Sequence, residues 1–139
     1  MTDQANAQMG RSGTSSIHER DVAAVAVRAL LSAEYAGRTF VLTGPESLTQ
    51  RHKVQLIGEA IGKDLSWEEI SPDQVRQAMT AQCLPADVPE RLLGSLADYA
   101  RPPEPSSANV KELLGPPSLA FAKWAAEHAD SFRNQEARP

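Results

Sequence analysis

The sequence predicts a mostly helical α/β domain with about two short strands and roughly five to six helices. Three observations support this fold class. Apolar residues recur at three- and four-residue steps in several segments, two short runs have strand-like composition, and capping residues or glycines separate the segments. The chain has 139 residues, of which 41% are hydrophobic and 23% charged, the size and composition of one globular domain.

The amino-terminal region is predicted to contain a disordered arm followed by a helix. Residues 1–15 are rich in Gln, Asn, Ser, Thr and Gly, and bury too little apolar surface to become ordered. Ser16-Ile17-His18-Glu19 has the spacing of a capping box, which predicts that a helix begins there and ends before Gly37. The apolar face of this helix comprises Val22, Val25, Ala26, Ala29 and Leu30.

Two strands are expected on either side of a second helix. Residues 39–42 form a short β-branched and aromatic run before Gly44-Pro45, which favours a buried strand. Ser47 or Thr49 is expected to cap the helix, which ends at Gly62. Its inner face comprises Val54, Ile57, Gly58 and Ile61. Residues 64–70 are the second expected strand, because Leu65 and Trp67 alternate with polar neighbours.

The remainder of the chain is predicted to be helical. Ser71 followed by Pro72 is typical of a helix start, and residues 87–90 resemble another. Prolines make residues 101–107 a linker before a short helix at 109–114. Ser118 is expected to cap the last helix. Two apolar stripes support these helices, Val75, Met79 and Cys83 in the first and Phe121, Trp124, Ala125, His128 and Phe132 in the last. Residues 16–132 are therefore expected to form one domain, and residues 133–139 a frayed tail.

Charge and composition argue against several classes of partner. Lys and Arg total 14 against 18 for Asp and Glu, a net charge of -4, so neither a nucleic acid nor an anionic membrane is an expected partner. No apolar run approaches the ~20 residues of a membrane-spanning helix. The polar start of the chain and the single Cys83 favour a cytoplasmic location.

The usual catalytic, cofactor and metal motifs are absent from the sequence. Gly10 and Gly13 have no strand before them, and neither a phosphate-binding loop nor a Gly-x-Ser-x-Gly elbow occurs. The three histidines, His18, His52 and His128, have no spacing typical of metal ligands. We therefore predict no catalytic residue, no cofactor-binding residue and no metal ligand in this chain.

Two segments nevertheless carry a family resemblance. Residues 17–23, Ile-His-Glu-Arg-Asp-Val-Ala, lead into a helix, and residues 42–46, Leu-Thr-Gly-Pro-Glu, follow the first expected strand. Together with the order and spacing of later motifs, they resemble the carboxyl-terminal half of an NmrA-like, atypical short-chain dehydrogenase/reductase. The later motifs are residues 47–50, 57–62, 68–70 and 114–117, then Phe121, Trp124, His128 and Phe132. The resemblance extends over residues 10–132.

The resemblance implies the carboxyl-terminal part of a Rossmann-like reductase and a substrate cleft. It places His18, Arg20, Thr43, Pro45 and Glu46 at this cleft, with Asp21 in the adjoining first turn of the helix. Family members bind NAD(P) through a glycine-rich loop in the first half of the fold, which has no counterpart here. The chain alone is therefore expected to bind no cofactor, and NAD(P) is expected only if a partner supplies the Rossmann half.

Three functions are compatible with this reading. The first is the substrate-side half of an NAD(P)-dependent oxidoreductase or redox sensor, inactive by itself. The second is a non-enzymatic dimerisation or regulatory interaction module, and the third is a remnant without function. Apolar residues such as Val25, Phe40, Leu42 and Ile57 need a covering surface, so the expected partner is a second copy or a nucleotide-binding chain.

Overall fold

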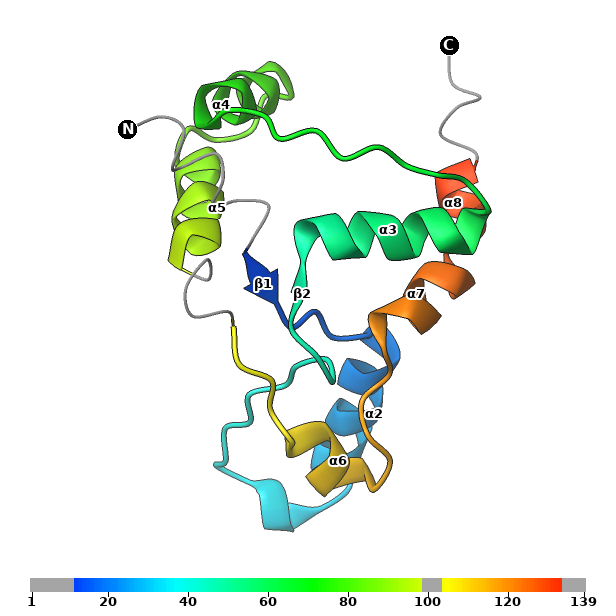
Figure 1. Cartoon of the computed structure of the whole chain (residues 1–139). Helices are drawn as coiled ribbons and strands as arrows, with labels where there is room; N and C mark the ends of the chain where they lie inside the picture. The colour runs from blue at the N-terminus through cyan, green and yellow to red at the C-terminus, as the bar shows by residue number, and fades with distance from the viewer. Residues whose placement is uncertain (1–11, 99–103, 134–139) are drawn as a thin grey trace.

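The computed structural model describes residues 12–98 and 104–133. Among these residues, helices surround one short antiparallel pair of strands, which confirms the predicted fold class (Figure 1). The elements in chain order are β1 (Gly13–Thr14), α2 (Glu19–Leu30), the 3₁₀ helix η1 (Ala33–Tyr35), β2 (Leu48–Thr49), α3 (Gln50–Ile61), α4 (Pro72–Ala81), α5 (Asp87–Asp98), α6 (Asn109–Leu114), α7 (Phe121–Glu127) and α8 (Ala129–Arg133).

The first strand of the pair, β1, lies in a segment that the sequence assigned to a disordered arm. Gly13 is paired with Thr49 and Thr14 with Leu48. Glu104 extends the pairing, because its N–H donates to the Gly13 carbonyl over 2.9 Å and its carboxylate accepts from the Ser15 N–H over 2.6 Å. The expectation for residues 12–15 is therefore wrong, since backbone hydrogen bonds order a segment that has little apolar surface. Residues 1–11 and 134–139 lie outside the described residues.

The two expected strands are both extended segments without ladder partners in the described part of the chain. At residues 39–42, the Val41 carbonyl accepts from side chains instead, from Ser107 Oγ at 2.7 Å and from Asn109 Nδ2 at 2.9 Å. Residues 64–70 run beside α3 without forming a strand. Alternating or β-branched residues indicate a preference for extended backbone, whereas a strand also requires a neighbouring strand.

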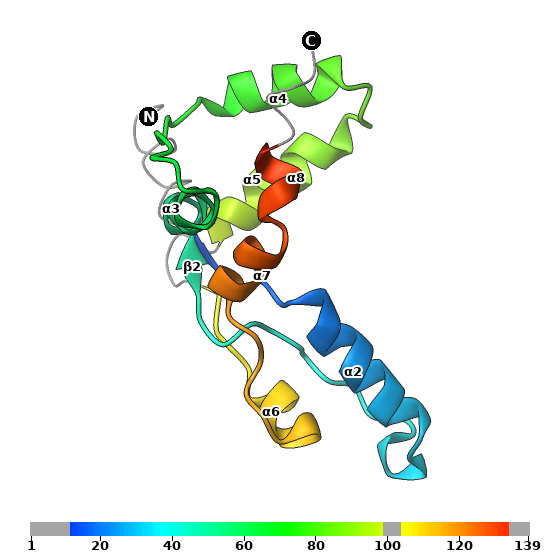
Figure 2. The same cartoon turned by 90° about the vertical axis from the view of Figure 1, so that its right-hand side faces the viewer.

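The helices pack in three separate groups (Figures 1 and 2). The α3 helix packs on α7 and α8, α2 packs on α6, and α4 pairs with α5 at the end of an extended connection. The buried apolar residues are all aliphatic and are spread over β2 and the helices: Val25, Leu48, Leu93, Val110, Leu113, Ala125 and Ala129. Within the described ranges, no helix is long and apolar enough to cross a membrane.

Local capping signals account for several helix ends. Thr49 Oγ1 accepts from the His52 N–H, Gly62 ends α3 in the left-handed region at φ 72°, and Ser71 forms a reciprocal capping box with Gln74. Other predictions are wrong. His18 caps α2 in place of Ser16, and Ala120 precedes α7 in place of a Ser118 cap.

Two further positions differ from the helical stripes expected for them. The last helix breaks at His128, because the backbone there leaves the helical region at φ -104° and ψ 10°, so α7 ends at Glu127 and α8 begins at Ala129. Cys83 is exposed and lies in the turn after α4 with φ 58°, whereas the sequence placed it on a buried helical face. The α4 helix ends at Ala81, so the stripe stops before Cys83.

Candidate substrate-binding cavity

A cavity of about 300 Å³ lies where the segment preceding α2 meets the start of α7. Its lining is mostly apolar and includes two aromatic rings: Ser16, Ile17, His18, Leu119, Ala120, Phe121 and Trp124. The volume is at the lower end of the range for small-molecule sites. An apolar pocket with few polar groups is the usual form of such a site.

His18 forms a buried wall of this cavity, with 2% of its surface exposed. Its Nδ1 accepts from the Arg20 N–H over 3.2 Å, and its Nε2 lies 3.1 Å from Oε2 of Glu127. With Nδ1 as the acceptor of the Arg20 N–H, Nε2 is the nitrogen that donates to Glu127, and Nδ1 also lies 3.3 Å from Oε2 of Glu19. Both ring nitrogens are thus engaged within the protein, and the ring serves the cavity as a wall.

Glu127 joins the end of α7 to the start of α2. Besides His18, its carboxylate accepts from Arg20 Nη1 over 3.2 Å and contacts Lys123 Nζ at 3.1 Å. The hydrogen bond from Lys123, the charge of Arg20 and the bond from His18 hold the pKa of Glu127 below its ordinary value. Glu127 could not be identified from the sequence, since it follows His18 by 109 positions.

Lys53 lies directly behind two lining residues. Only 8% of its surface is exposed, and its Nζ donates to Ser16 Oγ over 2.7 Å and to Thr14 Oγ1. The same ammonium lies 5.8 Å from the centre of the Phe121 ring. Burial lowers the pKa of Lys53, and the charge of Glu104 partly opposes this shift. Sequence reasoning missed Lys53 because lysine is almost always exposed.

Asp21 holds the loop that forms the other wall. It is 7% exposed, and its Oδ2 accepts from the Leu119 N–H over 2.7 Å. The carboxylate therefore fixes a lining residue through the backbone, at the beginning of the turn into α7. A hydrogen bond to a charged acceptor is among the stronger ones in proteins.

Residues 43–46 support the cavity from behind. Thr43 is buried, and its Oγ1 accepts from the Ser107 N–H over 2.7 Å. The Gly44 N–H donates to the Ser15 carbonyl over 3.0 Å, whereas Pro45 and Glu46 are exposed. Of the five cleft residues expected from the resemblance, His18 lines the cavity and Arg20 contacts Glu127 at its edge, with 66% of its side chain exposed. Contact of any of the five with a substrate stays a prediction.

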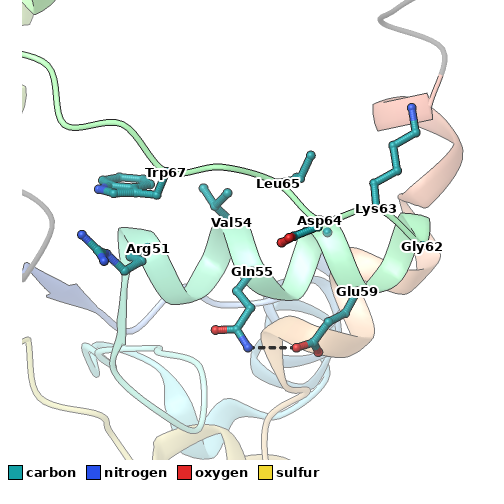
Figure 3. Close-up of a pocket in the computed structure, with 10 residues that line it drawn as sticks. Arg51, Val54, Gln55, Glu59, Gly62, Lys63, Asp64, Leu65 and Trp67 are labelled. Carbon is teal, nitrogen blue, oxygen red and sulfur yellow. Dashed lines mark hydrogen bonds between the residues drawn. The ribbon is translucent and has the colours of Figure 1, made fainter.

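A larger groove of about 630 Å³ lies along α3 (Figure 3). Arg51 and Trp67 line one end and Lys63 the other, while Gln55 donates to Glu59 over 3.0 Å between them. Gly58 allows residues 63–65 to approach, because a Cβ there would lie 2.7 Å from the Lys63 carbonyl oxygen. Among the described residues, the groove brings together none of the cleft residues that the resemblance implied.

Comparison with known proteins relates the chain to reductases. No protein-family model matches it. The chain is 38% identical to (4-alkanoyl-5-oxo-2,5-dihydrofuran-3-yl)methyl phosphate reductase of Streptomyces griseus, over 84% of this chain and 41% of that protein. It is 31% identical to an NAD(P)H azoreductase of Xenophilus azovorans, over 89% of this chain and 44% of that protein.

Two solved reductase structures share the fold of this chain. An NADPH-dependent quinone oxidoreductase of Escherichia coli superimposes with a TM-score of 0.70 at 20% identity, over 90% of this chain and 49% of that one. A Citrobacter triphenylmethane reductase complexed with NADP(H) gives a TM-score of 0.69 at 15% identity, over 88% and 43%. Over most of its length the chain is similar to the carboxyl-terminal half of NmrA-like reductases. It spans about two-fifths of the curated relatives.

The azoreductase and the quinone oxidoreductase are named for their use of NAD(P)H or NADPH, and a chain that binds such a dinucleotide needs a cradle for its pyrophosphate. A pyrophosphate cradle consists of a strand, a glycine-rich turn and the start of a helix. Here β1 leads through Ser15 to His18 without glycine, and β2 continues directly into α3. The described part of this NmrA-like chain therefore does not fit the dinucleotide.

Proposed function

We propose that this chain is the substrate-binding part of an NAD(P)-dependent oxidoreductase, and that its substrate occupies the cavity between Ser16–His18 and Phe121–Trp124. The observation that carries the proposal is the cavity itself. It is apolar, is lined by two aromatic rings, and is bounded by His18, the one cleft residue from the resemblance that the structure places in its wall. Relatedness to reductases over most of the chain supports the reaction class.

The proposed contribution of the chain to this function is binding and orientation. Phe121 and Trp124 lie with ring centres 5.2 Å apart, and Trp124 stacks on His128 at 4.7 Å, so these rings form one rigid surface. His18 uses both nitrogens on the protein, which leaves its ring to shape the wall. The dinucleotide that reduces the substrate is proposed to bind to a Rossmann half, in the same polypeptide or in a partner chain.

Ligand titration with and without nicotinamide cofactor tests this proposal. Acetophenone, as a small aromatic probe, should shift the amide NMR signals of Ile17, Leu119 and Phe121, and Trp124→Leu should weaken its binding. NADPH or NADH added to the chain alone should give no saturable shift. Saturable binding of either cofactor would contradict the assignment of the dinucleotide to another half. Shifts confined to the α3 groove would place the ligand elsewhere.

A second candidate function, a non-enzymatic interaction module, is favoured by exposed apolar residues on α2. Leu30 and Leu31 are 86% and 82% exposed, and Val27 is 56% exposed. Contiguous apolar surface of this kind marks contact with a partner. Light scattering distinguishes the candidates: a stable dimer that Leu30→Gln with Leu31→Gln converts to monomers would support the interaction module. A monomer at every concentration would oppose self-association.

A further inference from the structure

Ser16 occupies a special position among the residues of the cavity. It is exposed, it lines the cavity, and it is the lining residue that carries a hydroxyl group. The buried ammonium of Lys53 donates to its Oγ over 2.7 Å. The oxygen accepts this bond through a lone pair, so the hydroxyl proton can still be donated to a ligand.

Lys53 itself is directed at the protein rather than at the cavity. Its ammonium donates to Thr14 Oγ1 and Ser16 Oγ and lies over the face of Phe121. With 8% of the residue exposed, a ligand meets the Ser16 hydroxyl and not the charge behind it. A cation that bonds to a hydroxyl oxygen polarises the O–H bond and makes it a stronger donor.

We propose that Ser16, supported by Lys53, donates a hydrogen bond to the carbonyl oxygen of a small aromatic ligand that rests against Phe121 and Trp124. This inference rests on the proposed function, because it assigns a ligand class to the same cavity. The aromatic and apolar lining accounts for the ring of the ligand, and the one hydroxyl accounts for its oxygen. Lys53 is a positioning residue in this arrangement, since it acts through Ser16.

Two probes of nearly the same shape separate the hydroxyl from the cavity. Acetophenone and ethylbenzene share a ring and differ in the carbonyl oxygen, so the change in the ratio of their Kd values between the wild type and Ser16→Ala measures the hydrogen bond. We expect the wild-type chain to bind acetophenone about tenfold more tightly, the effect of one good hydrogen bond. Ser16→Ala should weaken acetophenone alone and remove the preference, and Lys53→Met should reduce it.

Matched controls use residues far from the cavity. Ser95→Ala on α5 and Lys111→Met on α6 change the same side-chain types at exposed positions, and should leave both Kd values unchanged. Equal binding of the two probes to the wild type, or a preference that survives Ser16→Ala, would overturn the role of Ser16 while leaving the cavity as a binding site. Failure of both probes to bind would overturn the inference and the proposed cavity together.

Discussion

Gly44 sets the distance between the supporting 43–46 loop and the segment that lines the cavity, and Gly44→Ala tests this role. The Gly44 N–H donates to the Ser15 carbonyl over 3.0 Å, and a Cβ on Gly44 would lie 2.2 Å from the Ser16 carbonyl oxygen. The obstructing atom belongs to the backbone and cannot rotate away. The two segments would have to separate by more than about 1 Å to restore van der Waals contact.

The expected cost of this separation is that of an overpacked core, roughly 1–3 kcal/mol of unfolding free energy. Urea denaturation measures the loss. Gly94→Ala provides the matched control, because Gly94 lies inside α5 with no atom within 4 Å of its added Cβ. That control should be neutral or should stabilise the chain by up to about 1 kcal/mol, the helix propensity of alanine over glycine. Equal midpoints for the two variants would refute the close approach of residue 44 to Ser16.

Three further predictions concern charge and backbone conformation. Glu127→Gln should destabilise the chain at pH 7, because the pKa of Glu127 in the folded chain lies below its ordinary value of 4.5. The ionised carboxylate therefore stabilises the fold above pH 4.5, and this stabilisation is lost as the pH falls through the folded pKa. The difference in urea midpoint between the variant and the wild type should disappear over the same pH range. The pKa of Lys53 is lowered in the folded chain, so over the pH range below its ordinary 10.5 the unfolded chain binds more protons at this residue than the folded chain. The stability of the wild type should therefore rise relative to that of Lys53→Met as the pH increases toward 10.5. A constant difference in melting temperature between the two proteins from pH 7 to pH 10.5 would contradict this. Cys83→Gly should raise the free energy of unfolding by about 1 kcal/mol, because glycine adopts φ 58° without steric cost; a lower urea midpoint would show that the turn is not left-handed.

Some helix ends could be predicted from the sequence because their signals are local. Thr49, Ser71 with Gln74, and Gly62 act within three or four residues of the backbone groups that they satisfy. The same reasoning applies to Asn109–Leu114, which ends before Gly115 at φ 92°. Such short-range hydrogen bonds form whatever the rest of the chain does, so these helices begin or end where the sequence predicts.

The strand pair could not be predicted because its partners are distant in the sequence. Thr14 is paired with Leu48, and Glu104 adds its own backbone and carboxylate bonds to the same edge. Residues 39–42 have better strand composition than Gly13–Thr14, yet within the described chain they have side chains as hydrogen-bond partners instead of a ladder. Strand pairing thus depends on which backbone segments meet in the fold, and the strand propensity of the residues does not determine this.

The cavity depends partly on residues that the sequence pointed to and partly on contacts between distant segments. The resemblance singled out His18, which lines the cavity in the structure. Its two hydrogen-bond partners, Glu127 and the Arg20 N–H, are known only from the fold. Lys53 was outside any sequence argument. A buried lysine is tolerated here because Thr14, Ser16 and the Phe121 ring all face its ammonium, and this contact set exists only after three segments have assembled.

The start of α2 connects these observations to the ligand proposed for the cavity. A capping box at Ser16 would have used the serine hydroxyl to bind the helix backbone. In the structure the helix begins at Glu19, and the His18 ring accepts the Arg20 N–H in its place. Ser16 is therefore released from capping and takes the Lys53 bond. The displaced helix start therefore leaves the Ser16 hydroxyl beside the Lys53 ammonium, in the wall of an apolar cavity.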